Sequence, residues 1–119
     1  MHVDNVVVLS APDNDDANGI QIDSNQYTSA SFNILFADGS ANGTIKIQAS
    51  NDIFNAGYMS SAFTVSNWTD IPDASVTISA GGRYLLMLPN LCYRWMRVVY
   101  ISSSGGSSTV TVNMFAQYP

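Results

Sequence analysis

The sequence predicts an all-β protein, an antiparallel β-sandwich of jelly-roll type with about eight strands. The first observation is composition: the chain has no Glu and one Lys, while Ser, Thr and Asn make up more than a quarter of its 119 residues. Ser and Asn compete with the helical backbone for hydrogen bonds, so this composition disfavours helices. The second observation is pattern, because short apolar runs recur between clusters of Gly, Pro, Asn, Asp and Ser. Short strands at such close spacing are typical of a sandwich or barrel.

The first half of the chain contains one β-branched run and two clean alternations. Residues 5–9 form the β-branched run, and residues 13–19 form an acidic turn after it. Residues 28–36 and 44–50 each alternate apolar with polar side chains, and a turn rich in Gly and Asn separates them. We therefore expect these two runs to pair as an antiparallel hairpin with one wet face.

The second half supplies the remaining strands. Residues 51–61 show no period and are expected to form a long loop. The expected strands after this loop are 63–68, 75–79, 83–88, 91–102 and 109–116, separated by turn signals at 70–73, 81–82 and 103–107. We expect one compact domain overall, in which residues 1–25 are an N-terminal arm with the acidic turn and residues 26–119 are the sandwich.

The alternation also predicts the hydrophobic core. Side chains two residues apart lie on the same face of a strand, so the register of each run assigns an inner face. The predicted core residues are Phe32, Ile34, Phe36, Ile45, Ile47, Val98, Tyr100, Val110 and Val112.

The run 91–102 is unusual because both of its faces are apolar. A sandwich strand needs only one apolar face, and large exposed apolar patches usually mark interaction sites. One interpretation is that a loop such as 51–61 covers the second face. The other is a subunit interface in a homo-oligomer, formed by Tyr93, Trp95, Val99 and Ile101.

Catalysis has no credible candidate residues in this sequence. The only histidine, His2, lies at the chain start, so a Ser–His or Cys–His pair has almost no base available. The nine Asp residues cluster at turns, where Asp normally serves by local hydrogen bonding. The segment 14–19 lacks the strongest ligands of a calcium loop, and no zinc spacing occurs. We therefore predict no enzyme activity, no cofactor and no metal.

Charge, hydropathy and cysteine content indicate which partners, locations and cross-links the sequence disfavours. The net charge of −5 opposes nucleic-acid binding, because phosphate contacts need clustered Lys and Arg. No apolar run reaches membrane-spanning length, and the start of the chain does not resemble a signal peptide. The single Cys92 excludes an internal disulfide and, beside Leu91 and Tyr93, is expected to be buried.

Sugar binding stays open as a different class of function. Trp and Tyr rings can stack on sugars, and β-sandwiches include many lectins, although the same rings commonly fill cores and contacts between subunits. The aromatic candidates are Trp68, Trp95, Tyr27, Tyr58 and Tyr93.

Several short stretches resemble a small β-sandwich module of tailed-bacteriophage structural proteins. Read in order, they give a first alternating strand, a G-T-φ-x-φ-Q-x-S-N-D run, W-T-D-φ, R-V-V-Y, a small Ser/Gly turn and a terminal strand. They occupy residues 31–36, 43–52, 67–71, 93–106 and 109–114.

The resemblance covers about the last three-quarters of the chain, and the first 25 residues fall outside it. It implies a non-enzymatic virion protein, most simply a capsid decoration or auxiliary protein, with itself and other virion proteins such as the major capsid protein as partners. It also implies synthesis in a host cytoplasm followed by assembly into the virion. The alternative is a carbohydrate-binding module of a tail or host-attachment apparatus.

Overall fold

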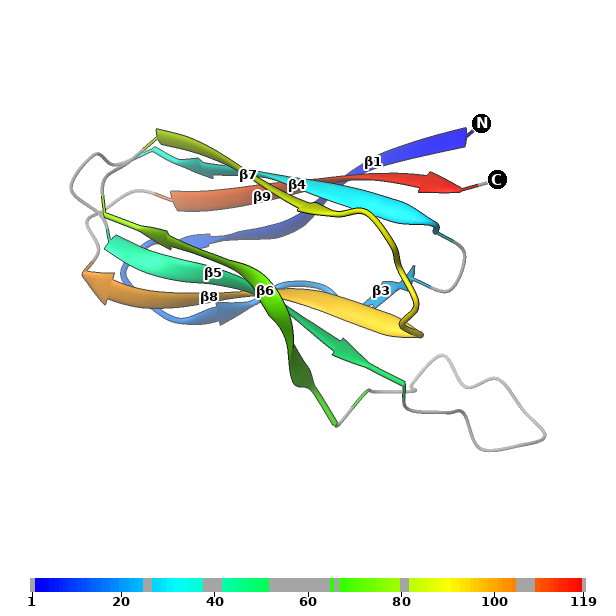
Figure 1. Cartoon of the computed structure of the whole chain (residues 1–119). Helices are drawn as coiled ribbons and strands as arrows, with labels where there is room; N and C mark the ends of the chain where they lie inside the picture. Colours follow the sequence, from blue (N-terminus) through cyan, green and yellow to red (C-terminus); the bar gives the residue numbers. More distant parts are fainter. Residues whose placement is uncertain are drawn as a thin grey trace.

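The computed structural model describes residues 2–24, 27–37, 42–51, 65, 67–79, 82–104 and 109–118. These residues form nine β-strands in two antiparallel sheets packed face to face, and no α-helix occurs among them (Figure 1). Sheet A contains, in spatial order, β1 (His2–Pro12), β9 (Thr109–Tyr118), β4 (Ser29–Phe36) and β7 (Gly82–Leu88). Sheet B contains the short β2 (Ala17–Asn18) and β3 (Ile22–Asp23), then β8 (Trp95–Ser104), β5 (Asn42–Ser50) and β6 (Thr69–Ile78). The predicted all-β sandwich is confirmed.

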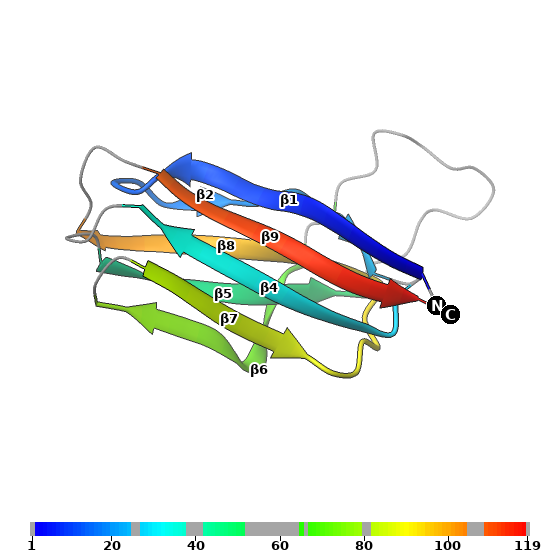
Figure 2. The ribbon, with the colours of Figure 1, turned by 90° about the horizontal axis from the view of Figure 1, so that it is seen from above.

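The strand pairing is nested, as in a jelly roll. β1 pairs with β9, β2 and β3 both pair with β8, β4 pairs with β7, and β5 pairs with β6. Since β2 and β3 lie along the same edge of β8, they count as one interrupted strand, and the sandwich has the eight strands of a jelly roll. Seen from above, the four strands of sheet A lie across those of sheet B, and the two termini meet at one end (Figure 2).

The N-terminal segment is part of the sandwich. β1 pairs with β9 from His2 to Pro12, with one register shift, and β2 and β3 form the edge of sheet B. The acidic turn between Pro12 and Ala17 carries the chain from one sheet to the other. Residues 2–24, most of the segment expected as an arm, therefore supply an edge strand to each sheet.

The predicted hairpin of residues 28–36 with 44–50 is wrong. β4 pairs with β7 and β9 in sheet A, whereas β5 pairs with β6 and β8 in sheet B. The alternation correctly identified the apolar face of each strand. It could not distinguish two neighbours in one sheet from two strands that face each other across the core, because both arrangements need one apolar face.

The predicted core is confirmed in full. All nine predicted residues are at most 2% exposed, so the register was correct on every strand concerned. Tyr100 is the largest of these side chains. Its ring packs edge-on against the Phe36 ring, with 5.4 Å between the ring centres. Its hydroxyl donates a 2.6 Å hydrogen bond to the backbone carbonyl of Asp13. This bond ties sheet B to the turn that leaves β1.

Two expectations for residues 63–79 need correction. Residues 70–73, expected as a turn, lie inside β6, where Asp73 has a φ of 62° and the pairing with β5 shifts register opposite Lys46 to Gln48. Asp tolerates this left-handed conformation better than most residues, so a turn-like sequence forms a bulge. Of the strand expected at 63–68, the described residues Val65, Asn67 and Trp68 are not in a strand.

Candidate functional site

The outer face of sheet B holds the residues that the sequence suggested as a subunit interface. Met96, Val98 and Tyr100 of β8 point into the core, so the alternate residues of β8 point outward. Trp95 and Val99 are nevertheless only 6% and 8% exposed within the single chain, Tyr93 is half-buried before β8 begins, and Ile101 is 38% exposed. The structure therefore covers two of the four predicted interface residues.

The chain that leads into β6 also lies against this outer face. The Val65 amide donates a 3.0 Å hydrogen bond to the Gln21 side chain at the β2–β3 edge, and Thr69 pairs with Ala49 of β5. Between these points Trp68 lies against the outer face of β8, with the Arg97 guanidinium 4.6 Å from its ring centre. Val65 and Trp68 thus lie on the outer side of sheet B.

Charged and amide side chains form a connected network beside Trp68. Lys46 forms a 3.1 Å ion pair with Asp70, and the Gln48 amide donates to the other Asp70 oxygen at 2.9 Å. The Nε of Arg97 donates a 2.8 Å hydrogen bond to the side-chain oxygen of Gln48. The hydrogen bonds from Gln48 and Lys46, with the Lys46 charge, hold the pKa of Asp70 below its ordinary value.

The outer face of sheet A differs in both chemistry and exposure. Its strands pair so that outward side chains form rows across the sheet: Phe115 lies opposite Ser31, Ser31 opposite Met87, and Asn33 opposite Leu85. Five large apolar side chains stand on this face, each 36–64% exposed, and we call them the apolar face: Val7, Leu35, Leu85, Met87 and Phe115.

The apolar face is also poor in charge. The polar residues between its apolar members are Ser31, Asn33, Thr111 and Asn113, and the one charged residue in these rows is Arg83, opposite Leu35. Among the described outward residues of β4, β7 and β9, none is an Asp. Large apolar side chains gathered on one exposed face with little charge often mark contact with another protein.

Sequence reasoning missed the apolar face, although a signal was present. The run Leu85-Leu86-Met87-Leu88 is apolar on both faces, as the run 91–102 is. Leu86 and Leu88 fill the core, whereas Leu85 and Met87 are 62% and 64% exposed. The signal was weaker because the run is short, and because Phe115 has polar residues, Asn113 and Gln117, at the neighbouring positions on the same side of its strand.

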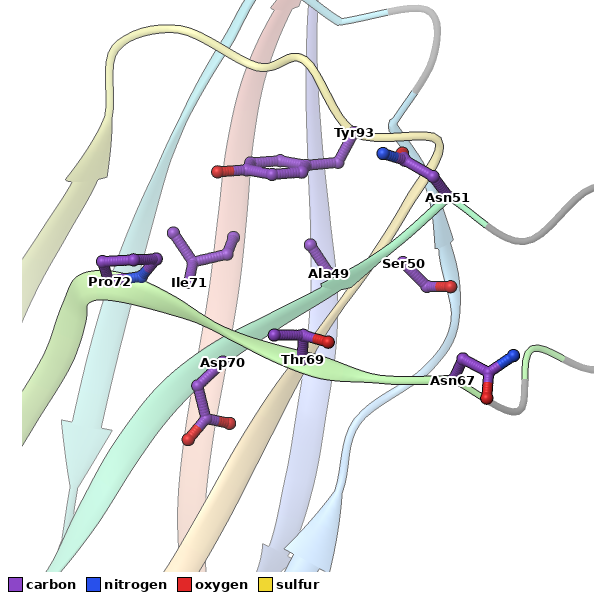
Figure 3. Close-up of a pocket in the computed structure, with 9 residues that line it drawn as sticks. All are labelled: Ala49, Ser50, Asn51, Asn67, Thr69, Asp70, Ile71, Pro72 and Tyr93. Carbon is purple, nitrogen blue, oxygen red and sulfur yellow. The ribbon is translucent and has the colours of Figure 1, made fainter.

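A pocket of about 370 Å³ lies where β5 ends and β6 begins (Figure 3). The Tyr93 ring extends over Ala49 toward Ile71, while Asp70 points to the other side of the strand (Figure 3). Asn51, Asn67 and Thr69 add amide and hydroxyl groups along the rim. An aromatic ring with nearby amides is the combination that sugar binding needs.

The other aromatic candidates for sugar stacking have structural partners. Tyr27 is buried, and its hydroxyl donates to the Asp4 carboxylate at 2.8 Å. Trp95 is buried with the Arg94 guanidinium 4.3 Å from its ring centre, and Trp68 packs on Arg97. Tyr58 lies outside the described residues.

Groups able to hold a metal are not gathered in the part of the chain that the structure describes. Cys92, expected to be buried, is exposed. It lies between β7 and β8, so the apolar neighbours that suggested burial do not continue the strand that begins at Trp95. The described residues also include no helix with the length and apolarity to cross a membrane.

Comparison with known proteins gives a likeness in fold. No protein-family model matches this chain, and no curated protein sequence matches it. Among solved structures, the crystal structure of the SPBc2 prophage-derived protein YomS is similar to it, with a TM-score of 0.56 and 13% sequence identity. The similarity covers 97% of this chain and 92% of the other. At this identity the likeness establishes the shared fold.

Proposed function

We propose that this chain is a non-enzymatic structural protein of a bacteriophage particle that assembles with copies of itself through the apolar face of sheet A. A capsid decoration or auxiliary protein is the role that suits it best, in contact with the major capsid protein and located in the virion. The similar fold of a prophage-derived protein supports a phage origin. The exposed apolar face supports assembly and is the observation on which the proposal rests.

Charge distribution favours a second copy as the occupant of this face. The chain carries a net charge of −5, so two copies repel each other over most of their surfaces. In the rows of the apolar face the single charge is that of Arg83. Two copies can therefore meet here without bringing carboxylates together or burying them unpaired.

The size of the face indicates a contact suited to a many-subunit assembly. Strand rise and spacing give a four-stranded face of about 500 Å². This is below the roughly 800 Å² per partner of a standard stable interface. We therefore expect weak pairwise association that becomes strong when many copies bind one particle together.

Sedimentation equilibrium over a range of concentrations tests this proposal. The native chain should show reversible self-association, and Leu85→Asp should weaken it about tenfold or more by placing a charge within the contact. Ile20→Asp is the matched control, because Ile20 is 54% exposed and lies away from sheet A's outer face. A native chain that stays monomeric at high concentration, or equal effects of the two variants, would contradict the proposed assembly.

The second candidate function is glycan binding during host attachment, and the Tyr93 pocket is the observation that favours it. A neutral sugar would stack on the Tyr93 ring and bond to the amides of Asn51 and Asn67. Titration with glucose and galactose, followed by tyrosine fluorescence or NMR, tests it. Tyr93→Ala should remove binding, whereas Tyr84→Ala, a half-buried Tyr on β7, should leave it unchanged.

A further inference from the structure

A depression of about 380 Å³ lies on the outer face of sheet B, apart from the Tyr93 pocket and from the apolar face. It is bounded by the edge residues Asp16 and Asn18, by Lys46 and Gln48 of β5, and by Arg97 and Ile101 of β8. Its volume is at the low end of the usual range for small-molecule sites, about 300–1,000 Å³. Two of the four Lys and Arg residues of an acidic chain thus line one small depression.

Arg97 is held in place by contacts that include no carboxylate among the described residues. Its Nε donates to Gln48 Oε1 at 2.8 Å, and its guanidinium packs on the Trp68 ring. The ion pairs of the described residues are Lys46–Asp70 and Arg94–Asp23, and neither includes Arg97. Partial burial lowers the pKa of Arg97, but a guanidinium stays charged at every physiological pH. Its terminal N–H groups are donors whose natural partner is a carboxylate or phosphate.

The surroundings favour a singly charged anion over a doubly charged one. Asp16 lines the depression. Asp70 forms an ion pair with Lys46 and a hydrogen bond with Gln48, two further residues that line it. Lys46 is balanced by Asp70, which leaves the Arg97 charge for a ligand. A carboxylate needs one such charge, whereas a phosphate dianion would meet unbalanced repulsion from the acidic neighbours.

The backbone around the depression favours a sugar over a peptide. β8 pairs with β5 on one side and with β2 and β3 on the other, and β5 pairs with β6 as well as β8. The backbone groups of β5 and β8 under the depression are therefore already used in the sheet, so a peptide lying over these two strands has no strand edge to pair with. Recognition over these strands must come from side chains. The Asn18 amide can bond to hydroxyl groups, as can the second oxygen of the Asp16 carboxylate, whose Oδ1 accepts from the Ser102 amide.

We propose that this depression binds a sugar unit that carries a carboxylate, with the carboxylate on Arg97 and the ring hydroxyls toward Asn18 and Asp16. The inference does not depend on assembly through sheet A. It adds a charged site to the glycan-binding alternative, at different residues and for a different class of sugar.

Titration of the ¹⁵N-labelled protein with glucuronate, glucose and acetate, followed by NMR, tests the proposal. Glucuronate should shift the amide signals of Lys46, Gln48 and Ile101 in a saturable way. Glucose, which lacks the carboxylate, and acetate, which lacks the ring, should each bind about tenfold more weakly or worse.

Three variants make the test specific. Arg97→Gln should weaken glucuronate binding about tenfold or more, because a charge-assisted pair of hydrogen bonds is lost. Arg83→Gln is the control, since it removes the same charge from an exposed residue of sheet A. Ile101→Glu places an anion at the depression without removing any contact of Arg97, so it should abolish binding even if Arg97→Gln fails to fold.

Three results would contradict the binding of a carboxylate-bearing sugar in this depression. The proposal is overturned if glucuronate causes no localised shifts, if Arg97→Gln and Arg83→Gln bind alike, or if acetate binds as tightly as glucuronate. Tyr93→Ala should leave glucuronate binding unchanged, so failure here is distinct from failure of the Tyr93 pocket.

Discussion

The outer faces of both sheets carry apolar residues, and yet these residues differ sharply in exposure between the two sheets. On sheet B, Trp95 and Val99 are nearly inaccessible within the single chain; the Arg94 guanidinium packs on the Trp95 ring, and Trp68 packs on Arg97, which lies between them on β8. On sheet A, Leu85 and Met87 are more than 60% exposed. An apolar outer face therefore marks a binding surface only if no connection of the same chain crosses it.

The largest expected effect separates covered from open apolar residues. Val99→Asp puts a carboxylate into a site that is 8% exposed, so it should reduce the free energy of unfolding by about 3 kcal/mol or more. Leu85→Asp changes a residue that is 62% exposed, so it should alter the free energy of unfolding by about 0.5 kcal/mol or less. Urea unfolding at a low protein concentration measures both.

The reverse outcome would support the subunit interface on sheet B that the sequence suggested. If Val99→Asp stays folded and loses self-association while Leu85→Asp keeps it, sheet B is the contact between subunits. Trp95, Tyr93 and Ile101 would then be its neighbouring members.

A smaller effect tests the Trp68 contact itself. Trp68→Ala removes the ring that packs on Arg97 over sheet B and should reduce the free energy of unfolding by about 1–2 kcal/mol. Met87→Ala removes an exposed side chain of sheet A and should change the free energy of unfolding by about 0.5 kcal/mol or less. Equal stabilities for the two variants would mean that this contact adds little stability.

The smallest expected effect concerns pH. The pKa of Asp70 lies below its ordinary value when the protein is folded, so the carboxylate stabilises the fold above that ordinary value. This contribution is lost as the pH falls through the lowered pKa. The stability difference between the native chain and Asp70→Asn should therefore be constant from pH 7 to about 5 and shrink below about 4.

Urea unfolding at several pH values measures this, with Asp15→Asn as the control. Asp15 is exposed and forms neither of the two ion pairs of the described residues. If the difference between the native chain and Asp70→Asn does not change with pH, the network on sheet B does not contribute to stability.

The alternation of side chains determined much of this fold in advance. Phe32, Ile45 and Val112 were assigned to the core from local pattern, because a period of two fixes which face of a strand is apolar. The same reasoning found the ranges of β4, β5, β7 and β9 to within a few residues. The absence of Glu and the scarcity of Lys indicated the all-β class.

Tertiary structure alone decided which strands are neighbours and which faces stay open. The alternation of β4 and β5 fits one sheet or two, and only the nested pairing placed them in opposite layers. The exposure of Leu85 and the burial of Val99 depend on which outer face other parts of the chain cover, which local sequence does not specify. The physical reason is that a strand's pattern records the polarity of its two sides, whereas pairing, cover and the site around Arg97 arise from contacts between residues far apart in the chain.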